Sequence, residues 1–153
     1  MSGSRLSVQE VCEILLARRE QIWFRAAMGG LIAAVFANIL GLYNMLTWAC
    51  AYAALQVAEL CIFPRARLET RDLRPSAAKG VLALLFANGV VFGSTSVIWA
   101  LSVGSWGFGC AGYLIAGATL NVVLTSPSSP RAFWASIAPY LGYLILLPML
   151  ALR

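Results

Sequence analysis

The sequence predicts an all-α integral membrane protein with about five transmembrane helices, preceded by an amphipathic helix. Hydrophobic residues make up 61% of the 153 residues and charged residues only 11%, whereas a soluble domain carries roughly 25% charged residues. The mean hydropathy is +0.82. No charged residue occurs between Gly80 and Pro130, and a hydrocarbon core roughly 30 Å thick requires apolar runs of about 18 or more residues.

The first expected element is an amphipathic helix, which makes residues 1–21 a region of their own. Ser7 and Glu10 have the spacing of a capping box. Val11 and Leu15 belong to an apolar stripe at helical spacing, with polar residues on the other side. We expect this helix to lie along the cytoplasmic interface of the membrane. The alternative is a helix that is surrounded by water.

The second region, residues 22–152, is expected to form the transmembrane domain. Nine of the eleven basic residues lie in two patches, Arg5–Arg25 and Arg65–Lys79. Because Lys and Arg are enriched in cytoplasmic loops, we expect both patches and the N-terminus in the cytoplasm. The same distribution makes the lipid bilayer a partner and argues against nucleic acid. The apolar stretches predict spans at residues 22–40, 45–63, 80–101, 108–124 and 132–152.

Two apolar segments of the chain match each other. The segment Gly30–Asn38 aligns with Gly80–Asn88 at an offset of fifty residues. A true repeat would make the chain a truncated six-helix domain of repeated hairpins, in which the fifth span lacks its partner. The alternative is a coincidence between two apolar segments.

Small residues recur every four positions along several spans, a pattern that lets helices approach each other closely in lipid. We expect these positions to serve packing within the chain; a homodimer interface is the alternative. The positions are Gly29, Ala33, Ala37, Gly41, Gly89 and Gly93.

Polar side chains within spans are candidates for a ligand contact or a switch, because burying them is costly unless they are paired. Glu59 is the only carboxylate in a predicted span, and Gln56 lies on the same helix face. Glu59 is about one turn from Pro64, so an ion pair with Arg25 or Arg65 is the structural alternative. Three asparagines either bind a polar ligand jointly or hydrogen-bond to neighbouring helices: Asn38, Asn88 and Asn121.

Several functions are excluded by what the sequence lacks. The chain has no His, which removes His-based acid–base catalysis, His metal sites and haem ligation. The four cysteines include no CxxC pair, and no Ser–base pair or glycine-rich phosphate loop is recognisable. We therefore expect no catalytic residue, no metal and no cofactor in this chain. The five tryptophans fall near predicted span ends and are expected to form an aromatic belt.

Motifs over nearly the whole chain carry a family resemblance. They are Ala17-Arg-Arg-Glu-Gln-Ile22, the run Trp48–Leu60, Trp106-Gly107, Gly117-Ala-Thr-Leu-Asn121, Phe133 and Ala138-Pro139. They resemble the multi-spanning N-terminal membrane region of bacterial sensor histidine kinases, especially hybrid ones. The resemblance implies a sensor or anchor module in the bacterial inner membrane that passes a signal to a cytoplasmic kinase core. This chain lacks the phosphoacceptor His of such a core, so the resemblance is limited to the membrane part.

Other functions stay open on the sequence alone. A small transporter or channel subunit would be favoured by a polar pore in an oligomer. An accessory subunit of a membrane complex and a membrane enzyme are the remaining alternatives.

Overall fold

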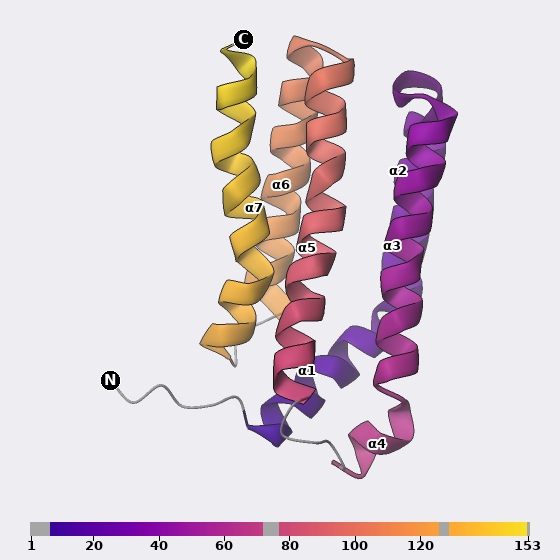
Figure 1. Cartoon of the computed structure of the whole chain (residues 1–153), viewed down its shortest axis with the longest axis vertical. Helices are drawn as coiled ribbons and strands as arrows, with labels where there is room; N and C mark the ends of the chain where they lie inside the picture. Colours follow the sequence, from indigo (N-terminus) through magenta and orange to yellow (C-terminus); the bar gives the residue numbers. More distant parts are fainter. Residues whose placement is uncertain (1–6, 72–76, 126–128, 153) are drawn as a thin grey trace.

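The computed structural model describes residues 7–71, 77–125 and 129–152, which form seven helices and no strand. Figure 1 shows five long helices side by side, with α1 and α4 at one end of the molecule. The helices are α1 (Val8–Glu20), α2 (Ile22–Leu40), α3 (Leu42–Ile62), α4 (Arg65–Glu69), α5 (Ala77–Ser102), α6 (Ser105–Thr125) and α7 (Pro130–Ala151).

Five of these helices, α2, α3, α5, α6 and α7, are long and apolar enough to cross a membrane. Each begins and ends within three residues of a predicted span, so the predicted fold class is confirmed. Large apolar side chains are exposed along them, as on α2, where Leu31 is 56% and Val35 is 53% exposed. A surface of this kind suits lipid, because soluble proteins rarely expose large contiguous apolar patches.

The local sequence explains where these helices end. Gly41 alone separates α2 from α3 and has a φ of 86°, a conformation that glycine adopts without strain. Pro64, which follows the end of α3, has no N–H to continue a helix. Ser129 caps α7 by accepting a hydrogen bond from the Ala132 N–H. Pro130 takes the first helical position, where an N–H would have no helical partner.

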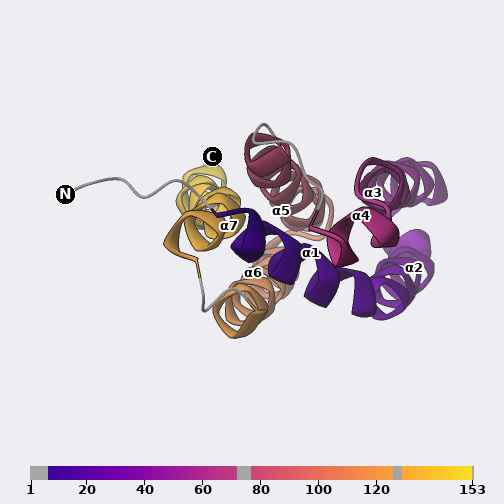
Figure 2. The same cartoon turned by 90° about the horizontal axis from the view of Figure 1, so that it is seen from below.

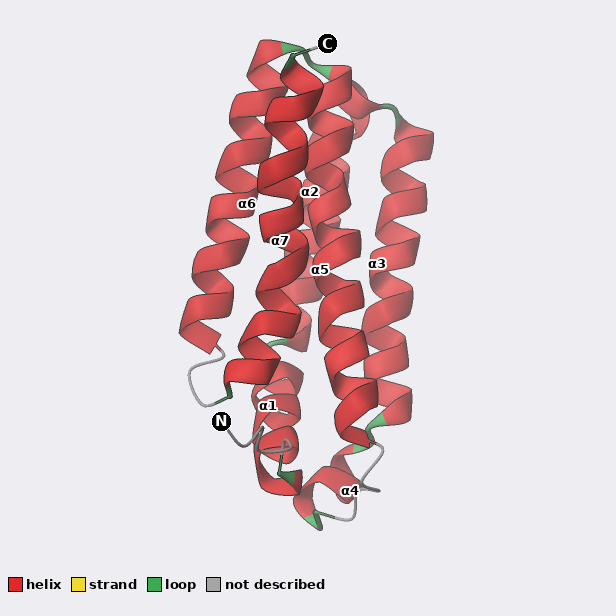
Figure 3. Cartoon of the chain, turned by 60° about the vertical axis from the view of Figure 1, so that its left-hand side comes forward, coloured by secondary structure: helices red, strands yellow, loops and turns green. Residues whose placement is uncertain are grey.

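The long helices divide into two groups. Helices α5, α6 and α7 pack into a three-helix bundle, whereas α2 and α3 form a hairpin that meets the bundle mainly between α3 and α5. Figure 2 shows α1 crossing one end of the molecule, from α7 towards α2, and Figure 3 shows α4 at that same end. We call it the basic end, because α1, α4 and the start of α2 bring together Arg18, Arg19, Arg25, Arg65 and Arg67.

The apolar face of α1 is buried against other helices of the protein rather than turned towards lipid. Val11 and Leu15 are 2% and 1% exposed and belong to one cluster with residues of α4 and α5. The predicted capping box is confirmed: Ser7 Oγ accepts from the Glu10 N–H, and the Glu10 carboxylate accepts from the Ser7 N–H. Helix α1 is therefore an integral part of the fold.

Three of the expected small-residue positions are close approaches between helices of this chain. A Cβ on Gly29 of α2 would lie 2.7 Å from Cδ1 of Tyr52 on α3. A Cβ on Gly89 of α5 would lie 2.9 Å from Cγ of Pro139 on α7, and one on Gly93 would overlap an aromatic ring of α7. These glycines let the backbones approach as membrane helices require.

Gly41 does not belong to that packing surface. It is exposed and forms the turn between α2 and α3, so the expectation that it packs against a helix is wrong. Ala33 and Ala37 are half-buried and pack beside the cluster that contains Trp48 and Trp99.

Two of the five tryptophans also differ from the expected aromatic belt. Trp48 and Trp99 are 4% and 7% exposed, and Trp48 Nε1 donates to the Val91 carbonyl of α5 at 2.8 Å. These two rings pack between helices, so a position near the end of a span did not predict that they are buried. The exposed tryptophans, which suit a belt, are Trp23, Trp106 and Trp134.

The two matching segments do not occupy equivalent places in their helices. Asn38 is exposed and lies two residues before the end of α2. Asn88 is 9% exposed, and α5 continues for fourteen residues beyond it. The similarity is therefore one of local sequence, and the two asparagines have different surroundings.

Candidate functional site

A buried ion cluster joins three helices at the basic end. Glu59, in the last turn of α3, is 4% exposed, and its carboxylate accepts hydrogen bonds from two guanidinium groups. Arg18 of α1 donates through Nη2 at 2.8 Å and through Nε at 3.2 Å. Arg25 of α2 donates through Nη2 at 3.1 Å and through Nη1 at 3.3 Å. One carboxylate is thus shared by two arginines.

The arginines also hold the backbone at this end. Arg25 Nη2 donates to the Arg18 carbonyl at 3.0 Å, and Arg19 Nη1 donates to the Phe63 carbonyl at 3.3 Å. The last carbonyls of a helix lack partners within the helix, so Arg25 satisfies one of them at the end of α1. Because removing one partner of a buried ion pair costs about 3–5 kcal/mol, the cluster strongly constrains the position of α1.

A second polar contact lies about one turn away along α3. Gln56 Nε2 donates to Asn88 Oδ1 at 2.7 Å, and Asn88 Nδ2 donates to the Leu84 carbonyl at 3.1 Å. Both side chains are buried, and Gln56 Oε1 has no partner among the residues the structure describes. The pair connects the α2–α3 hairpin to α5.

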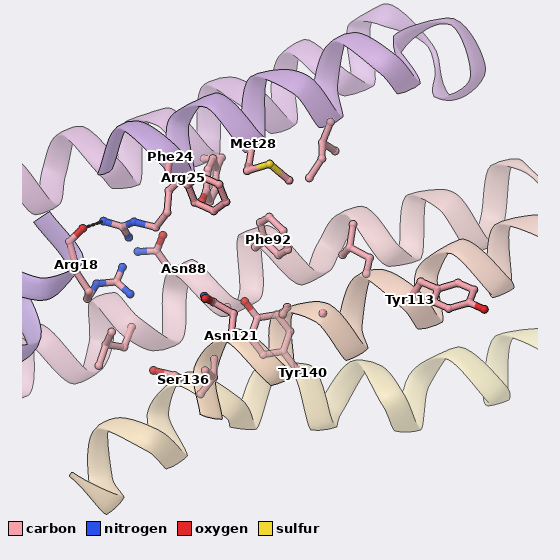
Figure 4. A pocket seen from close by; sticks show the side chains of 18 of the residues that line it. Arg18, Phe24, Arg25, Met28, Asn88, Phe92, Tyr113, Asn121, Ser136 and Tyr140 are labelled. Atoms are coloured by element: carbon pink, nitrogen blue, oxygen red, sulfur yellow. Dashed lines mark hydrogen bonds between the residues drawn. The ribbon is translucent and has the colours of Figure 1, made fainter. Parts of the chain in front are cut away.

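A cavity of about 450 Å³ lies between the hairpin and the bundle, next to α1, and its size is typical of ligand pockets, about 300–1,000 Å³. Arg18 and Arg25 line its basic end, and Figure 4 shows the two guanidinium groups beside Asn88. The lining combines polar and apolar groups from several helices. Other polar lining residues are Asn121, Ser136 and Tyr140, and apolar ones include Ile32, Phe92 and Leu114.

The cavity opens sideways, between α2 and α6. Phe24 of α2 is 68% exposed and Tyr113 of α6 is 84% exposed, although both line the cavity, so these rings form its rim. Helices α2 and α6 are not among the pairs that pack closely. A Cβ on Gly117 of α6, which also lines the cavity, would meet no atom within 4 Å. A ligand would therefore enter the cavity from the side, between α2 and α6.

The structure brings together four of the five polar candidates from the sequence. Asn88 and Asn121 line the cavity, Gln56 bonds to Asn88, and Glu59 holds the two arginines of the basic end. Asn38 is exposed near the opposite end of α2 and does not line the cavity. Of the two arginines that the sequence offered as partners of Glu59, Arg25 makes the ion pair and Arg65 pairs with Glu69 instead.

Sequence reasoning missed Arg18, Ser136 and Tyr140 as lining residues. Arg18 and Arg25 are seven residues apart, about two helical turns, and this spacing could have suggested a shared partner. Ser136 and Tyr140 are four residues apart on α7, which places both on one face. No sequence signal indicated that this face of α7 lines a cavity with α2, because that arrangement depends on how the hairpin packs against the bundle.

The groups of the site do not include an activated thiol. Cys12 is buried in α1, and its burial raises the pKa of the thiol, so that the nucleophilic thiolate is disfavoured. Within residues 7–71, 77–125 and 129–152, no cluster of three or more Cys, Asp and Glu could hold a metal ion.

Comparisons with protein-family models, with curated proteins and with solved structures found no match to this chain.

Proposed function

We propose that this chain is the membrane-embedded sensor or anchor module of a signal-transduction protein in the bacterial inner membrane. The observation that carries the proposal is the sharing of Glu59 between Arg18 and Arg25. Through it, helix α1 is bonded to the α2–α3 hairpin at the end of a cavity that could hold a stimulus. The chain itself catalyses nothing in this proposal.

The basic end supports the orientation in this proposal. Five arginines of α1, α2 and α4 lie there, and basic residues are enriched on the cytoplasmic side of membrane proteins. In the proposal α1 and α4 therefore face the cytoplasm, and α1 is the element through which a cytoplasmic kinase core would receive the signal.

Coupling between the cavity and α1 requires two states that a ligand distinguishes. A ligand between α2 and α6 would change the position of the hairpin relative to the bundle. Arg25 lines the cavity and bonds to both Glu59 and the Arg18 carbonyl, so a shift of the hairpin would be transmitted directly to the end of α1.

The test uses a histidine kinase core that is fused after Arg153 through one added apolar span, which places the core in the cytoplasm. We expect Glu59→Gln to change kinase phosphorylation per unit of membrane protein, because the two arginines then lose their shared anion. The matched control is Glu69→Gln, which removes an exposed carboxylate from α4 at the same end. Phosphorylation and membrane abundance are measured on the same samples.

Unchanged phosphorylation with Glu59→Gln at normal abundance would mean that the cluster serves structure alone, and the switch role would be abandoned.

The alternative of a small transporter or channel subunit is favoured by one observation, the cavity itself. Movement of a solute across liposomes that contain only the purified chain would establish that alternative, and turnover of a substrate by the purified chain would contradict the absence of catalysis.

A further inference from the structure

We propose that the cavity binds one anionic phospholipid of the cytoplasmic leaflet, with its phosphate at Arg18 and Arg25 and one acyl chain in the opening between α2 and α6. The inference names a ligand for the sensor proposed above and rests on that role only for its biological meaning. The binding site itself follows from charge, from the order of side chains along the cavity and from its access.

The basic end of the cavity carries a positive charge. Arg18 and Arg25 both line it, and Glu59 is the only carboxylate that bonds to them among the described residues. Two guanidinium groups with one carboxylate leave one positive charge, which a phosphate diester would neutralise. Arg25 Nε is buried and has no hydrogen-bond partner in the described part of the chain, so this guanidinium keeps a donor that is not yet satisfied.

The side chains along the cavity have an order that matches the parts of a phospholipid. Figure 4 shows Arg18 and Arg25 at one end with Asn88 beside them, then Ser136 and Asn121, then Phe92 and Tyr140, and Tyr113 at the far end. The polar groups that follow the arginines suit the ester groups of a lipid, which lie between its phosphate and its chains. Apolar side chains that suit an acyl chain are contributed by Ile32, Phe92 and Leu114.

Access to the cavity also suits a lipid. The rim side chains Phe24 and Tyr113 are exposed on helices long enough to cross a membrane, so a ligand arrives from the bilayer rather than from water. Arg25 lies three residues from the start of α2, or about 4.5 Å along the helix. That depth corresponds to the level of lipid headgroups at the cytoplasmic surface.

The experiment measures lipid binding to the full chain in detergent by native mass spectrometry, with phosphatidylglycerol, phosphatidylcholine and inorganic phosphate as probes. We expect one phosphatidylglycerol to bind tightly, phosphatidylcholine to bind more weakly, and inorganic phosphate not to bind. Equal affinity for the two lipids, or binding of phosphate alone, would overturn the proposal.

Arg25→Gln should weaken phosphatidylglycerol binding about five-fold, since one basic residue near anionic lipid contributes roughly that factor. The Arg18–Glu59 pair remains and keeps the site formed. The matched control, Arg67→Gln, removes an exposed charge of α4 that does not line the cavity and should leave the affinity unchanged. An equal loss in both variants would show general electrostatic attraction and refute a site.

Glu59→Gln should change the affinity for phosphatidylglycerol in the opposite direction to Arg25→Gln. It removes the carboxylate that competes for the two arginines, so affinity for phosphatidylglycerol should rise, whereas a purely structural cluster predicts a loss. A variant that keeps the cluster intact is Gly117→Leu, which adds a bulky side chain to the wall of the cavity and should weaken binding. Gly112→Leu, on the same helix but outside the cavity, should retain it. Binding by Gly117→Leu at full affinity would contradict the assignment.

These measurements separate the lipid site from the sensor role. If lipid binds as expected while the fused kinase does not respond to Glu59→Gln, the sensor role fails and the site stands. If the kinase responds but phosphatidylglycerol shows no preference over phosphatidylcholine, the lipid assignment fails and the coupling stands.

Discussion

The α5–α7 bundle and the α2–α3 hairpin have similar composition but are held together in different ways. In α5 ten residues are buried, among them two glycines that face α7, whereas in α2 only Gly29, Ile32 and Leu40 are buried. The hairpin meets the rest of the chain through an apolar cluster that contains Trp48 and Trp99, and through polar bonds of Trp48, Gln56 and Glu59. The bundle is thus held by close backbone packing, while the position of the hairpin depends in part on polar groups that a ligand or a charge can perturb.

The largest effect should come from overpacking the bundle. Gly93→Leu would place a side chain where the Tyr143 ring of α7 now lies, and overpacking typically costs about 1–3 kcal/mol. Gly30→Leu on α2 is the matched control, because a Cβ there meets no atom within 4 Å. Thermal unfolding in detergent should show a lower midpoint for the first variant only. Equal midpoints would remove the distinction between the two regions.

A smaller effect is expected where the hairpin meets the bundle. Trp48→Phe removes the hydrogen bond from Nε1 to the Val91 carbonyl, and one such bond contributes about 0.5–1.5 kcal/mol. Trp106→Phe changes a side chain that is 80% exposed and should have no measurable effect. Cysteines introduced into α3 and α5 should crosslink more slowly in Trp48→Phe, because the hairpin then separates from the bundle more often. If the crosslinking rate is unchanged in Trp48→Phe, packing rather than polar bonds holds the hairpin.

The most local effect is confined to the first turn of α1. Ser7→Ala removes a helix cap, which is worth about 1 kcal/mol, so amides of the first turn of α1 should exchange about five times faster. The Ser7 hydrogen bonds lower the pKa of Glu10 from its ordinary value of 4.5. This contribution is present above pH 4.5 and is lost as the pH falls through the lowered pKa. Exchange that is unaffected by both changes would show that tertiary packing alone keeps α1 folded.

The fold could be predicted from the sequence because the membrane imposes a simple pattern. Long apolar runs with few charges predicted the five long helices, and Gly41 and Pro64 marked where two of them end. The direction of the apolar face of α1 could not be predicted, since an apolar stripe fits lipid and protein equally well. Only the folded chain shows that Val11 and Leu15 meet α4 and α5.

The candidate site was predicted in part for a similar reason. Polar groups within apolar spans stand out, which led to Gln56, Glu59, Asn88 and Asn121. The cavity required knowledge of which helices lie side by side, and the local match that paired Asn38 with Asn88 gave no guidance. Periodicity assigns a residue to a face, whereas the neighbour of that face depends on tertiary packing.

The members of the ion cluster have a consequence for biosynthesis, because all of them lie in the first 59 residues. Glu59 can find Arg18 and Arg25 while α5, α6 and α7 are still being made, and insertion of α3 then proceeds with its carboxylate already neutralised. The bond between Gln56 and Asn88 has to wait for α5. The order of synthesis thus makes the groups that join α1 to the hairpin available before those that close the cavity.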